Sequence, residues 1–169
     1  IASSGGGTSI AVRGHSVKLG QGGIREIEFF VQTQQLIAGG RVEELRGRST
    51  TAMLEELAAH GWIDSETRDE MITDYWFLRD IEHAIQMIAD EQSHTLPRDD
   101  ESLQRVAALL GFAGIDPFSE RVLQALRRVN AHFAGLFVEQ AEGADDPAEY
   151  LVFTGDDDDP GTLERLHDL

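Results

Sequence analysis

The spacing of apolar residues between positions 24 and 140 limits the folds open to this chain of 169 residues more than any other feature. Apolar side chains recur there every three or four positions, which is the period of an α-helix and not the alternating period of a strand. The longest stretch carries a nearly heptad seam at Met71, Leu78, Ile81, Ile85 and Ile88. Such a seam is typical of antiparallel helix packing. We therefore predict an all-α fold.

Glycine, proline and capping residues divide this region into five predicted helices. The helices span about residues 24–38, 51–60, 65–92, 99–111 and 116–140. Asp64 and Asp99 are suitable N-caps for the third and fourth helices. The fifth would have Asp116 as its N-cap and Pro117 as its first residue. We expect an antiparallel bundle of about five helices. Any short strand would lie in a flank, within residues 10–19 or 149–154.

The periodicity also predicts which side chains face the core. The first helix should bury Ile24, Ile27, Val31, Gln34 and Ala38, with Phe30 and Ile37 beside them. The second should bury Leu54, Leu57 and Ala58, and the fourth Val106 and Leu109. The fifth carries an apolar stripe at Val122, Leu126, Val129, Phe133 and Leu136.

Composition excludes several classes of protein. The formal net charge is −17, which argues against nonspecific binding to nucleic acid. The chain has no cysteine, so disulfides and thiolate metal sites are impossible and a cytoplasmic location is compatible. No uninterrupted apolar run is long enough to cross a membrane. The histidines lack metal-ligand spacing, and we predict no metal site. The acidic run 156–159 is expected to be solvated rather than a calcium loop.

A glycine-rich turn at residues 20–23 precedes the first predicted helix. Such a turn lets backbone amides approach a ligand, and a helix start favours phosphate. The flanking residues Lys18 and Arg25 add positive charge, and Glu26 and Glu28 add carboxylates. The other interpretation is a glycine hinge that feeds an amphipathic helix.

The third predicted helix has a polar face that bears Arg79, Glu82, His83 and Gln86. These side chains could form one wall of an anionic ligand site, or they could simply be a solvated helix face. His94 follows this helix. We interpret it first as a structural residue at the helix end and second as a neighbour of an active site.

The glycine-rich stretch KLGQGGIREIEF, residues 18–29, closely resembles a segment of the glutamine synthetase adenylyltransferases. These large bifunctional enzymes attach AMP to a tyrosine of glutamine synthetase and remove it again. Four further segments fit the same family in the same order: VQTQQLIAGGR at 31–41, YWFLRDIEHAIQ at 75–86, DEQSHTLP at 90–97 and LVFTGD at 151–156. The resemblance covers roughly residues 10 to 160.

The resemblance implies a parent enzyme with two similar halves, each a nucleotidyltransferase domain followed by a helical bundle. The form of residues 22–28 resembles the amino-terminal, deadenylylating half. We therefore expect residues 1–23 to be the edge of a nucleotidyltransferase domain that is otherwise missing. Residues 24–142 would be the helical bundle, and residues 143–169 an acidic linker or tail.

In the family, the nucleotidyltransferase sheet carries Gly-Ser and then two aspartates that hold magnesium. Here Gly14-His15-Ser16 is not followed by Asp-x-Asp. We therefore expect this piece to be inactive alone and to bind no cofactor by itself. Mg²⁺ and ATP or ADP would be bound by the parent enzyme. The implied partners are glutamine synthetase and the PII signalling protein, with no nucleic acid and no membrane.

Six residues match the family motif beside the nucleotide: Lys18, Gly22, Gly23, Arg25, Glu26 and Glu28. The resemblance implies that Lys18 and Arg25 meet phosphate or the carboxylates of the active site. Glu26 and Glu28 lie about 200° apart around a helix, so one of them should be structural. Gln21 occupies a position where a basic residue is common in the family, which weakens phosphate binding.

Two alternatives stay open. A PII uridylyltransferase has a related helical domain, although residues 31–41 fit the adenylyltransferases better. The chain could also be a non-catalytic helical interaction module. Binding of ADP or ATP at submillimolar concentration would count against the latter.

Overall fold

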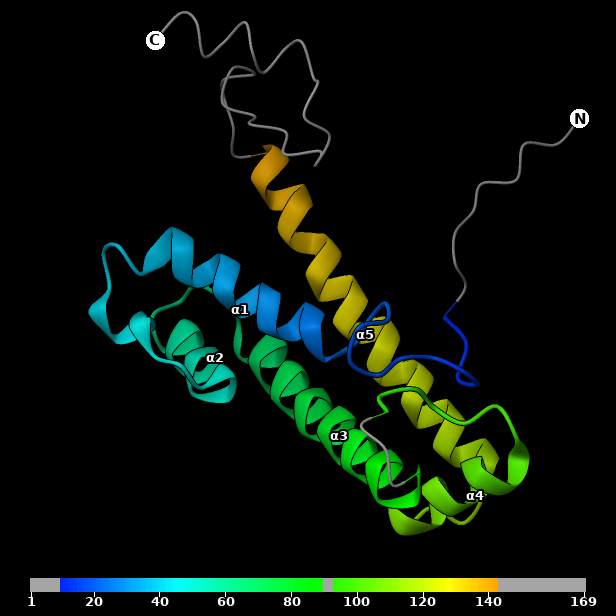
Figure 1. Cartoon of the computed structure of the whole chain (residues 1–169). Coiled ribbons are helices and arrows are strands. Elements are labelled where there is room, and N and C mark those ends of the chain that lie inside the picture. The colour runs from blue at the N-terminus through cyan, green and yellow to red at the C-terminus, as the bar shows by residue number, and fades with distance from the viewer. Residues whose placement is uncertain (1–9, 90–92, 143–169) are drawn as a thin grey trace, which may run out of the picture. The chain divides into compact units, whose positions relative to one another are not determined.

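The computed structural model of the chain describes residues 10–89 and 93–142 (Figure 1). The chain divides into two compact units, residues 1–136 and 137–169. The packing described below is that of the first unit. The predicted linker or tail at 143–169 and the strand candidate at 149–154 lie outside the described residues. The predicted domain boundaries stay predictions.

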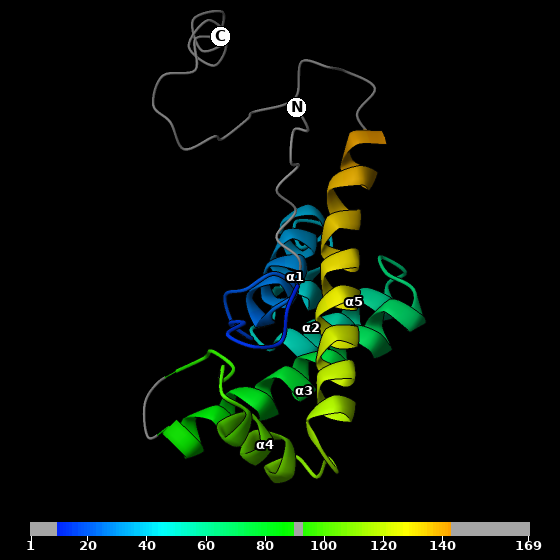
Figure 2. The same cartoon turned by 90° about the vertical axis from the view of Figure 1, so that its right-hand side faces the viewer.

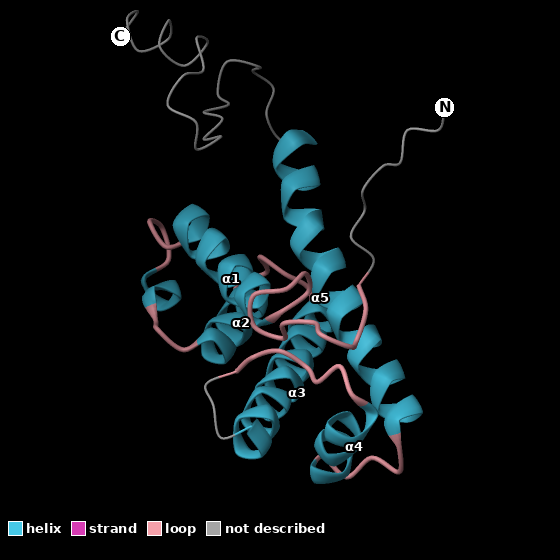
Figure 3. Ribbon diagram, turned by 45° about the vertical axis from the view of Figure 1, so that its right-hand side comes forward, coloured by secondary structure: helices cyan, strands magenta, loops and turns pink. Residues whose placement is uncertain are grey.

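The described residues form the helices α1 (Ile24–Ala38), α2 (Thr50–Ala59), α3 (Ser65–Ala89), α4 (Asp100–Leu109) and α5 (Ile115–Glu142). A short 3₁₀ helix, η1 (Glu43–Arg46), joins α1 to α2. Figure 3 shows helices and loops and no strand in the described part of the chain. The predicted all-α class is confirmed.

The strand expected within residues 10–19 is reduced to one isolated antiparallel bridge between Ser16 and Thr95. The reason is local, because this segment turns back on itself. The amide of His15 donates to the carbonyl of Val12, and that of Gly20 to the carbonyl of Ser16. These turns use donors that a longer ladder would need.

Side-chain caps fix the starts of α3 and α4 as predicted. Asp64 Oδ1 accepts from the amide of Thr67 over 2.6 Å, and Asp99 Oδ1 accepts from the amide of Ser102 over 2.8 Å. The predicted start of α5 is two residues too late. Its first helical residue is Ile115, so Asp116 lies in the first turn rather than at the N-cap.

The core is built around α3, which contacts α1, α2 and α4; Figure 2 shows α4 beside α3. Four residues of the predicted seam are buried, and Ile88 is only partly buried. They pack in one cluster with buried residues of α1 and α5. These partners include Ile24, Ile27, Val122, Leu126 and Val129.

Two residues predicted to face the core are about half exposed, Ile37 and Leu109. Ile37 lies at the edge of the buried stripe of α1, about 20° from Phe30 around the helix, and the next residue, Ala38, packs against Leu45 and Leu57. Leu109 is the last residue of α4, beyond the turn that buries Val106. Both predictions were wrong because periodicity alone does not show where the neighbouring elements end.

Helices α3 and α5 run antiparallel. Glu70, early in α3, meets His132, whereas Asp74, one turn later, meets Arg121. The contacts therefore move toward the start of α5 as they move along α3, in agreement with the predicted antiparallel bundle.

Candidate functional site

The glycines that precede α1 are required by packing. Gly22 has φ of 75°, and a Cβ at this position would lie 2.0 Å from the carbonyl oxygen of Leu126 on α5. A Cβ on Gly23 would lie 2.8 Å from the carbonyl oxygen of Val17. Side chains at either position would collide with backbone atoms. The loop is therefore closely packed against α5 and against itself.

The amides at the start of α1 are already used. The amide of Gly22 donates to Glu26 Oε2 over 2.9 Å. The amides of residues 23–26 donate to main-chain carbonyls over 2.9–3.0 Å. The expectation of unpaired amides waiting for phosphate is therefore wrong. Contacts with an anion here would come from side chains.

Side chains from three separate segments meet at Glu82, which is 2% exposed. Lys18 Nζ lies 3.3 Å and His94 Nδ1 lies 2.8 Å from Glu82 Oε1. Arg79 Nη1 donates to Glu82 Oε2 over 2.7 Å. We call these four residues the Glu82 cluster. It joins the glycine-rich loop, α3 and the turn that contains His94.

The contact between His94 and Glu82 is short but is not in hydrogen-bond geometry. The Nδ1 atom of His94 is buried and has no hydrogen-bond partner within the described structure, despite its 2.8 Å approach to Oε1. We read this contact as an electrostatic one. It leaves a buried ring nitrogen beside a buried carboxylate.

Main-chain hydrogen bonds hold the two loops of the cluster together. The amide of Gly14 donates to the carbonyl of Leu96, and the amide of Leu96 donates to the carbonyl of His15. The amide of Val17 donates to the carbonyl of His94 over 2.9 Å. The positions of Lys18 and His94 are thus set by backbone geometry on both sides.

The other predicted site residues lie apart from the cluster. Arg25 is 63% exposed, and its Nη1 is 3.7 Å from Glu28 Oε2. Glu26 caps the loop through Gly22 and also accepts from Asn130 Nδ2 over 3.4 Å. His83 is exposed and Gln86 is half-buried. The wall predicted on α3 therefore reduces to Arg79 and Glu82.

A shallow hollow of about 320 Å³ lies beside the glycine-rich loop. It is lined by Ile10, Ala11, Arg13, Gly14, His15, Gly20 and Gln21. His15 Nε2 lies 3.0 Å from the carbonyl oxygen of Gln21. Burial lowers the pKa of His15 below its ordinary value of 6.5, so this ring has reduced capacity to supply positive charge to the hollow.

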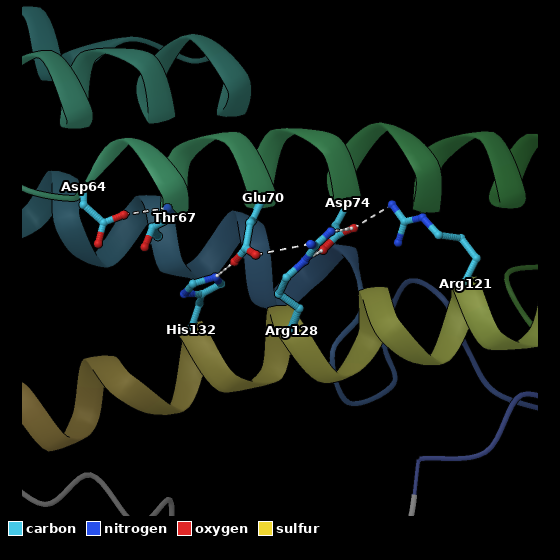
Figure 4. Close-up of polar contacts among 7 residues, drawn as sticks. All are labelled: Asp64, Thr67, Glu70, Asp74, Arg121, Arg128 and His132. Carbon is cyan, nitrogen blue, oxygen red and sulfur yellow. Dashed lines mark hydrogen bonds and ion pairs between the residues drawn. The ribbon is translucent and has the colours of Figure 1, made fainter.

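A second polar group, which the sequence reading missed, connects α3 and α5 (Figure 4). Asp74 is fully buried and pairs with Arg121 and Arg128, while Glu70 pairs with Arg128 and His132. We call these five residues the α3–α5 ion network. Hydrogen bonding to Asp74 raises the pKa of the Arg128 guanidinium. The signal was present in the sequence, because Glu70 and Asp74 are four residues apart on one helix face.

The described residues hold no group of three or more histidine, aspartate or glutamate side chains arranged for a metal ion. Within the same residues, no helix combines the length and the apolar character needed to span a bilayer.

Comparison with known proteins places these observations in a family. Residues 4–137 match the family model described as GlnD PII-uridylyltransferase. Relatives named bifunctional glutamine synthetase adenylyltransferase/adenylyl-removing enzyme include those of Mesorhizobium japonicum, 59% identical over 160 residues, and Brucella melitensis, 62% identical over 157 residues. The relative from Rhodopseudomonas palustris is 49% identical over 165 residues.

These alignments cover 95%, 93% and 97% of this chain, respectively. The chain spans only 16% of the length of each of these relatives. The family model carries the uridylyltransferase name, whereas these relatives carry the adenylyltransferase name. The chain therefore belongs to the GlnD PII-uridylyltransferase family, and within it corresponds to a segment of the bifunctional glutamine synthetase adenylyltransferase/adenylyl-removing enzymes.

Proposed function

We propose that this chain is the helical domain beside the adenylyl-removing site of such a bifunctional enzyme and is inactive alone. The observation that carries the proposal is the Glu82 cluster. It brings together three of the segments that resemble the adenylyltransferases, although Lys18 and Glu82 are 64 positions apart in the chain. The three segments are far apart in the sequence but build one local structure. This is a reason for all three to be present in the same chain.

In the proposed reaction, a phosphate oxygen attacks the phosphorus of the AMP group on a tyrosine of glutamine synthetase. The bond from phosphorus to the tyrosine oxygen breaks, ADP is released and the tyrosine oxygen takes up a proton. Mg²⁺, held elsewhere in the parent enzyme, would neutralise phosphate charge. Lys18 and Arg25 would add positive charge near the transferred group.

The remaining roles follow from the same assignment. Gly22 and Gly23 allow the loop to pack, Glu26 caps it, and Glu28 orients Arg25 on the surface of α1. ATP or ADP would bind to the parent enzyme, and the PII signalling protein would regulate it. The parent enzyme would work in the cytoplasm, where glutamine synthetase is its target.

The sharpest test of the proposed function is Arg25→Ala in the full-length parent enzyme. The side chain is 63% exposed and its pair with Glu28 is long, so its removal should hardly change stability. If Arg25 faces the phosphorus of the transferred AMP group, deadenylylation should fall by about 10²-fold. Adenylylation, catalysed by the other half, should be much less affected.

Arg105→Ala is the matched control, because Arg105 is equally exposed and pairs with Glu101 on the surface of α4. Deadenylylation that stays intact in the Arg25 variant would show that Arg25 has no role at the site. Measurable turnover by the isolated chain would contradict the proposal that it is only a flanking domain.

The name of the family model favours one other function, a uridylyltransferase that modifies the PII protein. Assays of the parent enzyme with UTP and PII, in parallel with ATP and glutamine synthetase, would decide between them. Transfer of UMP to PII without any transfer to glutamine synthetase would overturn the proposed function.

A further inference from the structure

We propose that Lys18, Arg79 and His94 form a phosphate-binding site on the surface of the Glu82 cluster. Its ligand would be a phosphate group, either inorganic phosphate or the terminal phosphoryl group of a nucleotide. This proposal deepens the proposed function by giving one site a ligand, and it rests on that function for the biological identity of the ligand. The binding itself is a property of this chain.

The first argument is charge. Glu82 is buried and supplies one negative charge, whereas Lys18 and Arg79 supply two positive charges even when His94 is neutral. The chain has 31 acidic residues and only 14 lysines and arginines. Two of these scarce cations meet at one carboxylate, which is more positive charge than a single carboxylate needs for neutralisation.

The second argument is exposure. Glu82 has 3% of its side chain exposed, while the side chains of Lys18, Arg79 and His94 are 30%, 32% and 27% exposed. Solvent therefore reaches part of each of these three side chains, whereas the carboxylate of Glu82 is shielded from it. Partly buried cations bind anions more strongly than exposed ones, because solvent screens them less.

The third argument is donor geometry. Lys18 and His94 lie against the same oxygen of Glu82, and Arg79 lies against the other, so the three side chains are close neighbours. The contact of Arg79 with Glu82 uses one N–H of a guanidinium that has five. The ammonium of Lys18 has three N–H groups around its single contact with Glu82. A tetrahedral phosphate can accept from several such donors at once.

The fourth argument is preorganisation. The main-chain hydrogen bonds between residues 14–17 and 94–96 fix the segments that carry Lys18 and His94. Arg79 projects from the middle of the 25-residue helix α3. The three groups therefore need little ordering when a ligand binds, which lowers the entropic cost of binding.

The test is a titration of sodium phosphate into the full 169-residue chain at constant ionic strength, with sodium chloride as the balancing salt. Binding is followed by the NMR signals of the histidine rings, and His94 is assigned with a His94→Gln variant. We expect a saturable shift of the His94 signals that exceeds the shifts of the other five histidines. Chloride alone should not produce it.

Arg79→Gln and Lys18→Gln should each weaken phosphate binding by about tenfold, since each removes a charged donor. Arg105→Gln is the matched control and should bind as the original chain does, because its exposed pair with Glu101 lies on α4. Circular dichroism tests whether each variant folds. If Arg79→Gln does not fold, Lys18→Gln decides, because its side chain lies in a loop and makes the longest contact of the cluster.

Parallel titrations with ADP separate the two sources of phosphate. Tighter binding of ADP assigns the site to the terminal phosphoryl group of a nucleotide, and equal or weaker binding assigns it to the inorganic ion. No saturable binding of either up to about 50 mM, or equal affinity in both cluster variants and the control, would overturn the proposal.

The outcomes also separate this site from the proposed function. Phosphate binding by the chain, combined with a parent enzyme that does not act on adenylylated glutamine synthetase, would leave the site in place and remove the proposed function. If the chain does not bind phosphate but the parent enzyme acts on adenylylated glutamine synthetase, the site is overturned and the proposed function stands.

Discussion

Arg128 holds Asp74 through two hydrogen bonds, from Nε to Oδ2 and from Nη2 to Oδ1, each 2.7 Å long. Arg121 Nη2 donates to the same Oδ1 over 2.9 Å, and its guanidinium lies 4.4 Å from the centre of the Phe77 ring. The buried carboxylate of Asp74 is thus bound by two arginines that lie about two turns apart on α5. This arrangement fixes the register of α5 along α3, because a shift of either helix would separate the bidentate pair.

Replacing Arg128 should destabilise the chain strongly. Arg128→Met removes the bidentate partner and leaves the fully buried Asp74 with Arg121 alone. Loss of one partner from a buried pair costs about 3–5 kcal/mol, which urea denaturation would measure. Arg127→Met is the control, because this neighbouring arginine on α5 is exposed. Equal stabilities of the two variants would show that the α3–α5 ion network adds nothing to stability.

Adding a methyl group at Gly22 should disturb the loop before α1. The backbone has a positive φ there, and the new Cβ would lie 2.0 Å from the carbonyl oxygen of Leu126. We expect Gly22→Ala to cost about 1–3 kcal/mol or more. Gly40→Ala is the control, since a Cβ there meets no atom within 4 Å. A thermal midpoint that is the same for both variants would mean that the loop accommodates the methyl group without loss of stability.

The apolar seam of α3 predicts a further loss. Leu78 is fully buried in the main core cluster, and Leu78→Ala should cost about 2–5 kcal/mol through lost burial and the cavity left behind. Leu36→Ala, at an exposed position of α1, should change the free energy of unfolding by less than about 0.5 kcal/mol. An unchanged melting curve for the Leu78 variant would contradict its place in the core.

Acid should weaken the start of α4. Hydrogen bonding from the amide of Ser102 lowers the pKa of Asp99 below its ordinary value of 3.8. The unfolded chain therefore binds this proton more readily than the folded chain, so the stabilisation is present above pH 4 and is lost as the pH falls through the folded pKa. Denaturation between about pH 5 and pH 2 measures this loss.

Asp99→Asn keeps an oxygen acceptor at the N-cap but carries no titrating carboxyl. It should match the original chain near pH 7 and lose less stability in acid. Asp99→Ala should be less stable at both pH values because it lacks the cap. A steep acid dependence that persists in the asparagine variant would assign the effect to other carboxylates.

Local features of the fold were predictable because their causes lie close together in the sequence. Helix α1 has the predicted bounds, since Gly23 and Gly39 bracket a run without glycine or proline. The caps Asp64 and Asp99 need only an amide three residues ahead. By contrast, η1 was not predicted, because its four residues carry no apolar period of their own.

The candidate site was predictable only in part. Periodicity placed Arg79 and Glu82 near one another on α3, but nothing local brings Lys18 and His94 to the same carboxylate. The same limit hid the partners of Asp74, which are 47 and 54 positions away. The prediction that the amides beside the glycine-rich turn at residues 20–23 are open to phosphate was wrong for a related reason. These amides donate to acceptors that only the folded loop brings near them.

The hydrogen bonds that join residues 14–17 to residues 94–96 use only main-chain atoms. Any amino acid except proline can supply the donors at positions 17 and 96, whereas the donor at position 14 has φ of 72° and favours glycine. Mutation can therefore exchange the side chains at positions 18 and 94 without removing the bonds that hold them in place. The backbone pairing of the two loops can therefore persist while the side chains at positions 18 and 94 change, in evolution or in a directed library.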